Sequence, residues 1–233
     1  MRIYYAPEIE TTLELPADEA RHCVKVLRSR PGDEITIVDG RGNIIRARLT
    51  EVTNKHCGVE IITREREEKI WDGYIHLAVA PTKNIDRVEW LAEKATEIGM
   101  DRLSFLNCRY SERRVVKTDR IDRIVVSAVK QSLKATKPQV DEMEDFMDFV
   151  NRPFDGRKFI CHCYDTPKKP LKDVVVRGER SLVLTGPEGD FSEEEVKAAI
   201  QAGFEPVSLG RARLRTETAS LCAVHILNLA NQK

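Results

Sequence analysis

The sequence predicts an α/β protein in which a small N-terminal β-barrel precedes a larger domain with a parallel sheet. Short strand patterns fill most of the first seventy residues, and from Tyr74 onward buried apolar strands alternate with amphipathic helices. Such alternation predicts a parallel sheet that helices cover on both faces, whereas closely spaced strands with one helix predict a barrel. The chain of 233 residues has room for both domains, which we expect at residues 1–72 and 73–233.

The expected N-terminal domain contains four strands and one helix. The strand patterns span residues 2–5, 34–38, 43–52 and 56–63. Helical spacing occurs only over residues 17–27. The stretch 64–72 is dominated by charge and has no apolar period, so we expect a linker or a solvated strand end there.

The expected C-terminal domain alternates strands with helices. We place its strands at residues 75–80, 103–106, 159–163, 181–185 and 206–209. Helices are expected at residues 84–98, 119–135 and 193–202, and from about residue 216. Ser192 begins a capping box with Glu195, which specifies the start of the third of these helices.

Charge and apolar patterning limit the class of function. Lys and Arg total 38, as do Asp and Glu, but the segment 109–137 holds nine basic and three acidic residues and predicts a basic face. No apolar stretch approaches the roughly 18 residues of a membrane span, and the first residues lack a signal peptide's apolar region. We therefore expect a cytoplasmic protein without a membrane partner.

The cysteine pattern does not predict a metal site. None of the six cysteines forms a Cys-x-x-Cys pair. In a strand, Cys161 and Cys163 would share one face and His162 would point to the other. We expect ordinary burial of these side chains and no metal.

The first candidate loop is Gly186-Pro187-Glu188-Gly189-Asp190-Phe191-Ser192, between a buried strand and a helix, where parallel sheets bind ligands. Gly186 and Gly189 permit backbone conformations closed to other residues and let a ligand approach the main chain closely. Glu188 and Asp190 would repel phosphate, and the loop lacks the Walker Gly-Lys-Ser/Thr, so a phosphate site is disfavoured. Taken alone, the segment also fits an ordinary Gly-Pro turn.

The second candidate loop carries three alternating arginines, Arg211, Arg213 and Arg215. Thr216 is expected to cap the last helix, and Glu217 in its first turn suits the helix dipole. The arginines fit either a solvated basic turn or a pocket that contacts nucleic-acid phosphate or a developing negative charge.

Several segments form a recognisable set: Leu184-Thr185-Gly186-Pro187-Glu188-Gly189, Leu209-Gly210, Leu214-Arg215-Thr216-Glu217-Thr218-Ala219, His22-Cys23-Val24-Lys25-Val26-Leu27-Arg28 and Trp90-Leu91-Ala92-Glu93-Lys94-Ala95-Thr96-Glu97-Ile98-Gly99. Together they closely resemble the RsmE family of SPOUT methyltransferases, and the resemblance spans nearly the whole chain. The sequence departs from the family pattern at Asp190, where a second glycine is usual, at Lys130, and at Arg211-Ala212-Arg213.

The resemblance implies a fold, an activity and partners. The C-terminal sheet would be a SPOUT-type domain with a trefoil knot, and the N-terminal barrel would be PUA-like and bind RNA. The implied activity is S-adenosylmethionine-dependent methylation of N3 of a uridine in 16S ribosomal RNA, within the small ribosomal subunit. The implied assembly is a homodimer packed through the C-terminal domains.

The expected site residues follow from the resemblance and from the chemistry of the loops. The cofactor would be bound by Leu184, Thr185, Gly186, Pro187, Glu188, Gly189, Leu209, Gly210, Leu214, Arg215, Thr216 and Thr218. RNA contacts are expected from His22, Arg28, Arg109, Arg113, Arg114, Arg211 and Arg213. Arg215, or else Arg211 or Arg213, would stabilise the negative charge that spreads onto the uridine carbonyl oxygens. Glu217 is either the general base that removes the N3 proton or a residue that complements the helix dipole. No metal is required. Trp90 is expected in the core.

Two other functions stay open. A non-catalytic RNA-binding or ribosome-assembly factor would keep the knot and lose the chemistry, and Asp190 is the residue that would spoil the cofactor loop. A phosphate-binding α/β enzyme would need lysine or open helix termini where this chain has Glu188 and Asp190.

Overall fold

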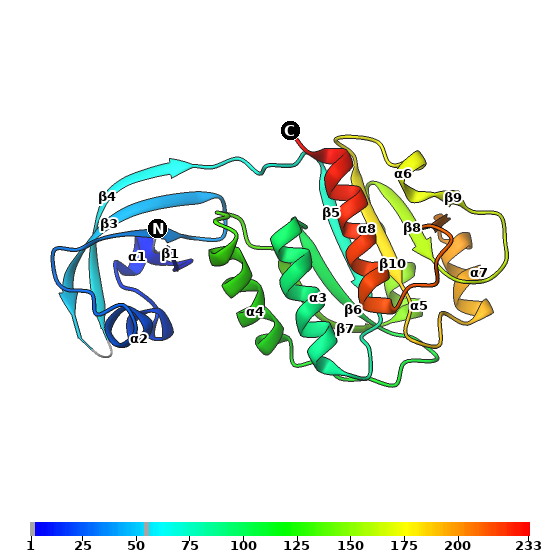
Figure 1. The fold of residues 1–233 in the computed structure, drawn as a ribbon, viewed down its shortest axis with the longest axis horizontal. Coiled ribbons are helices and arrows are strands. Elements are labelled where there is room, and N and C mark those ends of the chain that lie inside the picture. Colours follow the sequence, from blue (N-terminus) through cyan, green and yellow to red (C-terminus); the bar gives the residue numbers. More distant parts are fainter. Residues whose placement is uncertain (1–2, 54–55) are drawn as a thin grey trace. The chain divides into compact units, whose positions relative to one another are not determined.

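The computed structural model describes residues 3–53 and 56–233, which form two compact units (Figure 1). The first unit contains the described residues up to Lys69 together with Val126–Lys137, and the second contains Ile70–Val125 and Pro138–Lys233. The segment Val126–Lys137 includes the end of helix α4 (Thr118–Gln131), and its grouping with the first unit has no signal in the sequence. No helix in the described part of the chain is long and apolar enough to cross a membrane.

Four strands form the sheet of the first unit, in the order β1-β2-β3-β4. They are β1 (Ile3–Tyr5), β2 (Glu34–Val38), β3 (Asn43–Val52) and β4 (Cys57–Arg66). The pair β1 and β2 is parallel, and the other two pairs are antiparallel. Ile45, Ala47 and Leu49 alternate along β3 and are buried, so one face of the sheet packs on the core. Residue 2 of the expected first strand lies outside the described residues.

Two further helices belong to this unit. Helix α2 (Ala17–Lys25) confirms the expected helix, and Ala20 and Cys23 lie on its buried face. Helix α1 (Ile9–Thr12) is a single turn, too short to show a helical period in the sequence. Strand β4 continues to Arg66, so the charged stretch begins as a solvated strand end.

Seven strands form the sheet of the second unit, in the order β7-β6-β5-β10-β8-β11-β9, and every pairing is parallel. They are β5 (Tyr74–Val79), β6 (Arg102–Asn107), β7 (Gln139–Asp145), β8 (Arg157–Cys161), β9 (Lys169–Pro170), β10 (Arg180–Thr185) and β11 (Phe204–Ser208). The predicted fold class, a parallel α/β sheet after a small β unit, is confirmed. The edge strands β7 and β9 lack the apolar runs that reveal the other five.

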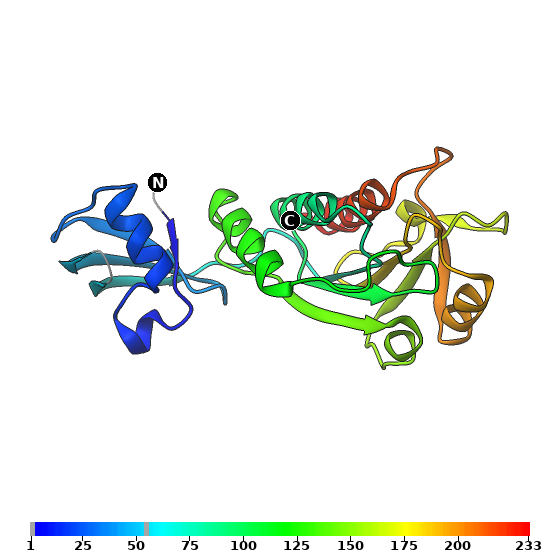
Figure 2. The same ribbon diagram turned by 90° about the horizontal axis from the view of Figure 1, so that it is seen from below.

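Helices cover both faces of this sheet. They are α3 (Ile85–Ile98), α5 (Phe146–Val150), α6 (Leu171–Val174), α7 (Glu193–Gln201) and α8 (Thr216–Asn231). Helices α3 and α8 pack on each other and α8 contacts β5 and β10, whereas α5 packs on α7, β6 and β7. Figure 2 shows α3 and α8 on one face of the sheet and α5 and α7 on the other.

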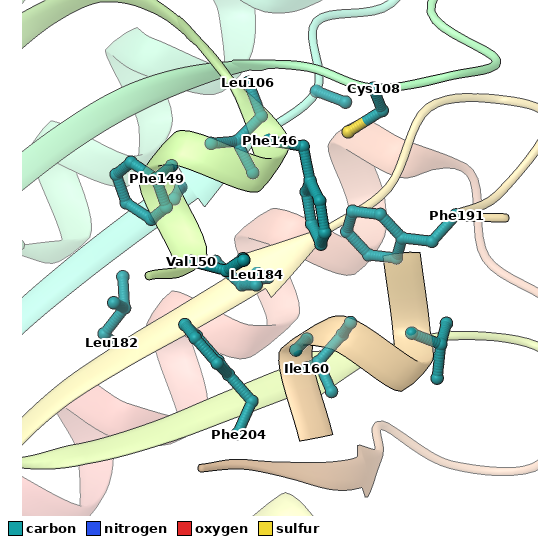
Figure 3. Close-up of a cluster of buried hydrophobic side chains, with 14 residues drawn as sticks. Leu106, Cys108, Phe146, Phe149, Val150, Ile160, Leu182, Leu184, Phe191 and Phe204 are labelled. Atoms are coloured by element: carbon teal, nitrogen blue, oxygen red, sulfur yellow. The ribbon is translucent and has the colours of Figure 1, made fainter. Parts of the chain in front are cut away.

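The core beneath α5 and α7 is rich in phenylalanine (Figure 3). Leu182 and Leu184 of β10 point into it, since alternate residues of a strand share a face. Phe191 comes from the loop after β10, and its ring centroid lies 5.2 Å from that of Phe146. That loop is therefore anchored in the core beside the carboxyl end of its strand.

Helix α3 corrects one sequence expectation. Its buried residues Val88, Leu91, Ala92 and Ala95 recur at helical spacing and face the sheet. Trp90 falls outside this row and is 43% exposed, so the expectation that it lies in the core is wrong.

Between β11 and α8 the chain runs past the carboxyl-end edge of the sheet. Strand β11 pairs with β8 and β9 on one side of β10, whereas α8 contacts β10 and β5. The chain therefore passes the carboxyl end of β10 between Ser208 and Thr216. The expected trefoil knot depends on this crossing.

Candidate functional site

The carboxyl end of β10 lies at the centre of the second unit's sheet. Its last residue, Thr185, pairs with Val79 at the end of β5 and with Cys161 at the end of β8. The loops after these three strands consequently emerge at one edge, where parallel sheets bind ligands. The Thr185 hydroxyl also lies 2.6 Å from the Ser220 hydroxyl, which ties the strand end to α8.

Residues Gly186–Ser192 form the glycine loop, and residues Leu209–Arg215 form the arginine loop. The Thr216 hydroxyl, at the end of the arginine loop, donates to the Gly186 carbonyl oxygen at 2.9 Å. The two loops that the sequence singles out therefore meet.

The acidic side chains of the glycine loop are held by backbone N–H groups. The Lys83 amide donates to Glu188 Oε1 at 2.9 Å, and the Cys163 amide donates to Asp190 Oδ2 at 2.7 Å. These bonds join the glycine loop to the loops after β5 and β8. Both carboxylates thus hold the loops at this edge of the sheet together.

Gly186 and Gly189 do not use the conformational freedom of glycine, because neither has a positive φ. Close packing accounts for both glycines. A Cβ atom at Gly186 would lie 3.1 Å from the Phe191 backbone nitrogen, and one at Gly189 would lie 3.1 Å from Tyr110 Cβ. Any side chain at either position would displace the neighbouring segment.

Asp190 has the unusual backbone conformation, with φ of 64°. Aspartate tolerates this left-handed region better than most residues because its short side chain can bond locally. Its Oδ1 accepts from the Phe191 amide at 2.8 Å, in addition to the bond from Cys163. Asp190 therefore fits the position at which the RsmE pattern has glycine.

One carboxylate holds the far end of the glycine loop. Glu195 Oε2 accepts from the Ser192 amide at 2.7 Å, and the Ser192 hydroxyl accepts from the Glu195 amide, which confirms the capping box. Glu195 Oε1 accepts from the Arg109 amide at 2.8 Å. A single side chain therefore fixes both the start of α7 and the loop after β6.

The arginine loop offers an open apolar surface. Gly210 has φ of 132°, which side chains rarely adopt, and a Cβ atom there would meet no atom within 4 Å. Leu209 and Leu214 are half-buried. A flat apolar group would find space and contact here.

Thr216 does not cap α8, and that prediction is wrong. Arg215 occupies the N-cap position without a side-chain capping bond, and Thr216 is the first helical residue. The Thr216 hydroxyl is used instead for the bond to Gly186. The competing acceptor belongs to a distant loop, which the local sequence does not reveal.

Arg211, Arg213 and Arg215 are exposed. Within the described residues, none of their guanidinium groups has a hydrogen bond or an ion pair. Three cationic groups on seven residues are therefore available to an anionic partner.

The basic segment before α4 divides into two kinds of residue. Arg109 and Arg114 are exposed. Arg113 is half-buried, and it donates through Nε to the Thr82 carbonyl at 3.0 Å and through Nη2 to the Lys83 carbonyl. Arg113 thus braces the loop after β5.

Glu217 is 9% exposed in the first turn of α8, and Arg87 Nη1 lies 3.4 Å from its Oε1. Its Oε2 atom is buried and has no hydrogen-bond partner among the described residues. A buried acceptor without a donor costs free energy, so this oxygen is an unsatisfied polar atom beside the site. Arg87 was not singled out from the sequence, because an arginine in the first turn of a helix matches no motif.

His22 and Arg28 belong to the first unit. His22 is exposed on α2, and Arg28 is exposed just after it with φ of 51°. The other expected RNA-binding residues, from Arg109 to Arg213, belong to the second unit.

The segment around His162 differs from the expected strand. Strand β8 ends at Cys161, so strand alternation does not extend to Cys163, which is exposed. Burial raises the pKa of the Cys161 thiol to about 12. Across residues 3–53 and 56–233, no group of three or more His, Cys, Asp or Glu side chains is placed to hold a metal ion.

The fold and the site define a class of protein. A parallel α/β unit gathers its loops at one strand edge and presents free arginines there, and a small β unit precedes it. The family model of the RNA methyltransferase domain matches residues 70–228, and that of the RNA methyltransferase PUA domain matches residues 15–62. The chain belongs to this RNA methyltransferase family.

Individual relatives agree in sequence and in fold. The ribosomal RNA small subunit methyltransferase E of Synechocystis is 29% identical over 97% of this chain and 77% of its own length. A probable rRNA-methyltransferase from Porphyromonas gingivalis is 40% identical, with a TM-score of 0.93 over 99% of this chain and 98% of that one. The Neisseria gonorrhoeae ribosomal RNA small subunit methyltransferase E, solved with S-adenosyl methionine, is 30% identical, with a TM-score of 0.85 over 96% and 95% of the two chains.

Proposed function

We propose that this protein transfers a methyl group from S-adenosylmethionine to N3 of one uridine in 16S ribosomal RNA, within the small ribosomal subunit. The observation that carries the proposal is the hydrogen bond between Thr216 and Gly186, which joins the two loops beside the free Arg215. The relatives named as ribosomal RNA small subunit methyltransferases support the substrate, and the Neisseria structure supports the cofactor.

The residues of the site fit S-adenosylmethionine. Half-buried Leu209 and Leu214 and the space beside Gly210 suit an adenine ring. When bound, the cofactor supplies a methyl group on a positively charged sulfur. Its proposed binding residues are Leu184, Thr185, Gly186, Pro187, Glu188, Gly189, Leu209, Gly210, Leu214, Arg215, Thr216 and Thr218.

At Leu184 only backbone groups are available, because its side chain is buried in the phenylalanine-rich core. Glu188 Oε1 already accepts from the Lys83 amide. We assign main-chain contacts to both residues. The same holds for Gly186 and Gly189, where a side chain would collide with the protein itself.

We assign the stabilisation of the reacting base to Arg215. Uridine N3 has to lose its proton, and the resulting negative charge spreads onto the flanking carbonyl oxygens. A guanidinium group held next to those oxygens lowers the barrier because it meets the charge as it develops. Arg215 is at the N-cap of α8, so its backbone is fixed while its side chain is free.

Glu217 is our candidate for the proton acceptor. Its Oε1 is paired with Arg87 and its buried Oε2 has no partner among the described residues, so one oxygen is anchored and the other can take up a proton. The alternative is that Glu217 only complements the dipole of α8. Glu217→Gln separates the two roles: loss of a general base lowers kcat by a factor of about 100 or more.

The remaining parts of the proposal concern RNA and assembly. We propose that residues 1–72 form the RNA-binding domain and residues 73–233 the catalytic domain. RNA phosphates would be contacted by His22, Arg28, Arg109, Arg113, Arg114, Arg211 and Arg213, so binding should weaken with added salt. We also propose a cytoplasmic homodimer that packs through the C-terminal domains.

The decisive experiment uses small ribosomal subunits from cells that lack this protein. The subunits are incubated with the purified protein and S-adenosylmethionine, and the RNA is digested and analysed by mass spectrometry. We expect one equivalent of 3-methyluridine in 16S ribosomal RNA. Arg215→Ala should lose methyl transfer while cofactor affinity stays within about tenfold, or 1.4 kcal/mol. Unchanged turnover in that variant would contradict the role given to Arg215.

A non-catalytic RNA-binding factor is the alternative that the same materials test. Asp190 was its main support, but the bonds to Phe191 and Cys163 show that this residue is accommodated in the glycine loop. Calorimetry with S-adenosylmethionine decides between them. Absence of binding in the micromolar range would favour the non-catalytic factor.

A further inference from the structure

We propose that Tyr110 is a stacking platform for an unpaired base of the substrate RNA. This inference rests on the proposed function and adds a residue to it that neither candidate loop contains. Tyr110 lies in the loop after β6, and its side chain is 49% exposed. An aromatic side chain that stays half in water forgoes much of the free energy that burial would give it.

Tyr110 stands directly on the glycine loop. A Cβ atom at Gly189 would lie 3.1 Å from Tyr110 Cβ and 3.6 Å from its Cγ. The inner part of the tyrosine therefore packs on the Gly189 backbone, and the remainder is left for another molecule. A methyl acceptor has to come to this same edge of the sheet.

The backbone on both sides of Tyr110 is held by hydrogen bonds. The Arg109 amide donates to Glu195 Oε1 at 2.8 Å. The Cys108 amide donates to the Ser111 hydroxyl at 3.0 Å, and the Ser111 amide donates to the Cys108 carbonyl at 3.1 Å. A platform that is already fixed loses little conformational entropy when a base stacks on it.

Charge around Tyr110 selects a nucleic-acid base as the occupant. The Arg109 guanidinium carbon lies 6.0 Å from the Tyr110 ring centroid, and Arg114 is exposed in the same segment. Proteins bind unpaired RNA by combining aromatic rings with cationic groups that contact the backbone phosphates. The proposed reaction also requires an unpaired base, because N3 of uridine is part of its Watson–Crick edge.

The test compares four Tyr110 variants with the wild-type protein. Tyr110→Phe and Tyr110→Trp keep a ring, Tyr110→Leu keeps a larger apolar side chain on Gly189 but has no ring, and Tyr110→Ala keeps only the Cβ atom next to Gly189. The substrate is the unmethylated small subunit, and three quantities are measured: KM for the subunit, kcat, and cofactor affinity by calorimetry.

We expect Tyr110→Leu and Tyr110→Ala to raise KM by about tenfold, in keeping with the loss of one base stack. Tyr110→Phe and Tyr110→Trp should stay within about threefold of the wild type, because stacking needs only the ring face. Cofactor affinity of Tyr110→Leu should be unchanged. If Tyr110→Leu instead weakens cofactor binding and leaves KM unchanged, the residue only packs the glycine loop and the proposal is overturned. Wild-type kinetics in Tyr110→Leu would overturn it too.

A second measurement keeps the inference separate from the proposed chemistry. Subunit RNA substituted with 5-iodouracil is irradiated in complex with the protein, and cross-linked peptides are identified by mass spectrometry. We expect a cross-link at Tyr110 that Tyr110→Leu abolishes. If the wild-type protein produces no 3-methyluridine but the cross-link forms, the proposed function fails and the platform stands. If methylation occurs and the cross-links map elsewhere, the platform fails alone.

Discussion

Arg87 and Glu217 form an ion pair of 3.4 Å between the first turns of α3 and α8, the two helices that share one face of the sheet. The carboxylate is almost buried, whereas the Arg87 side chain is 39% exposed. The pair therefore anchors Glu217 from the solvent side and leaves its second oxygen unbonded.

Removal of Arg87 should show how much its ion pair with Glu217 contributes to stability. Arg87→Ala leaves a buried carboxylate without its counter-charge, and we expect the free energy of unfolding to fall by about 2 kcal/mol. Arg87→Lys keeps the positive charge and should recover at least half of the loss. Urea denaturation measures both variants, and an Arg87→Ala protein as stable as the wild type would show that the pair has no structural role.

Substitutions of Asp190 should rank by how well they replace its two functions. Asp190→Asn tolerates the positive φ and keeps one acceptor oxygen, so we expect cofactor affinity within about threefold of the wild type. Asp190→Ala loses both acceptors and strains the backbone, which together should cost about 2 kcal/mol of stability. Asp190→Gly should fall between them. Thermal unfolding and calorimetry give the ranking, and Asp190→Gly above wild type in both would show that the bond to Cys163 contributes nothing.

The contact between Gly189 and Tyr110 predicts a compensating pair of substitutions. In Gly189→Ala the new Cβ atom would lie 3.1 Å from Tyr110 Cβ, so the glycine loop has to shift and cofactor affinity should fall by about tenfold. Gly189→Ala combined with Tyr110→Gly removes the collision and should regain most of that affinity. Calorimetry of both single variants and the double variant gives the coupling energy, and strict additivity would mean that the two residues act independently.

Stability should fall on acidification because of His76. This residue is buried, its Nε2 lies 2.7 Å from the Ser104 hydroxyl, and burial lowers its pKa to about 3. An unfolded histidine titrates near pH 6.5, so between pH 6.5 and pH 3 the unfolded chain binds more protons. The contribution of His76 is therefore complete above pH 6.5 and declines by up to about 1.4 kcal/mol per pH unit below it.

Urea unfolding of the wild type and of His76→Asn between pH 4.5 and pH 7.5 tests this prediction. The variant loses stability overall. The slope of its unfolding free energy against pH should be smaller than that of the wild type by the equivalent of about one bound proton. Parallel curves for the two proteins would mean that His76 titrates alike in the folded and unfolded chains.

The sequence predicts those parts of the fold whose signals are local. The apolar runs of β5, β6, β8, β10 and β11 are confirmed to within two residues at each end, and the capping box of α7 is confirmed. Strand β7 was missed because it reads Gln-Val-Asp-Glu-Met-Glu-Asp, with no apolar run. Strand β7 lies at an edge of the sheet, where a strand has fewer neighbours and needs no continuous apolar run.

The candidate site was predictable in composition but not in its connections. The two loops and their arginines are visible as motifs, and they do meet. Thr216 reads as a cap, however, because a local pattern cannot reveal a competing acceptor 30 residues away. Gly189 likewise reads as a conformational glycine, although its neighbour Tyr110 is what excludes a side chain. Long-range packing decides both cases.

The glycine loop also has a consequence for biosynthesis. Its Glu188 is bonded to Lys83, 105 residues earlier in the chain, and Glu195 of the helix that follows it to Arg109, 86 residues earlier. Thr216, which closes the loop from the other side, begins the last helix. A nascent chain therefore cannot close the glycine loop in this way before Thr216 has been translated. A frameshift shortly before α8 would remove the bond between Thr216 and Gly186.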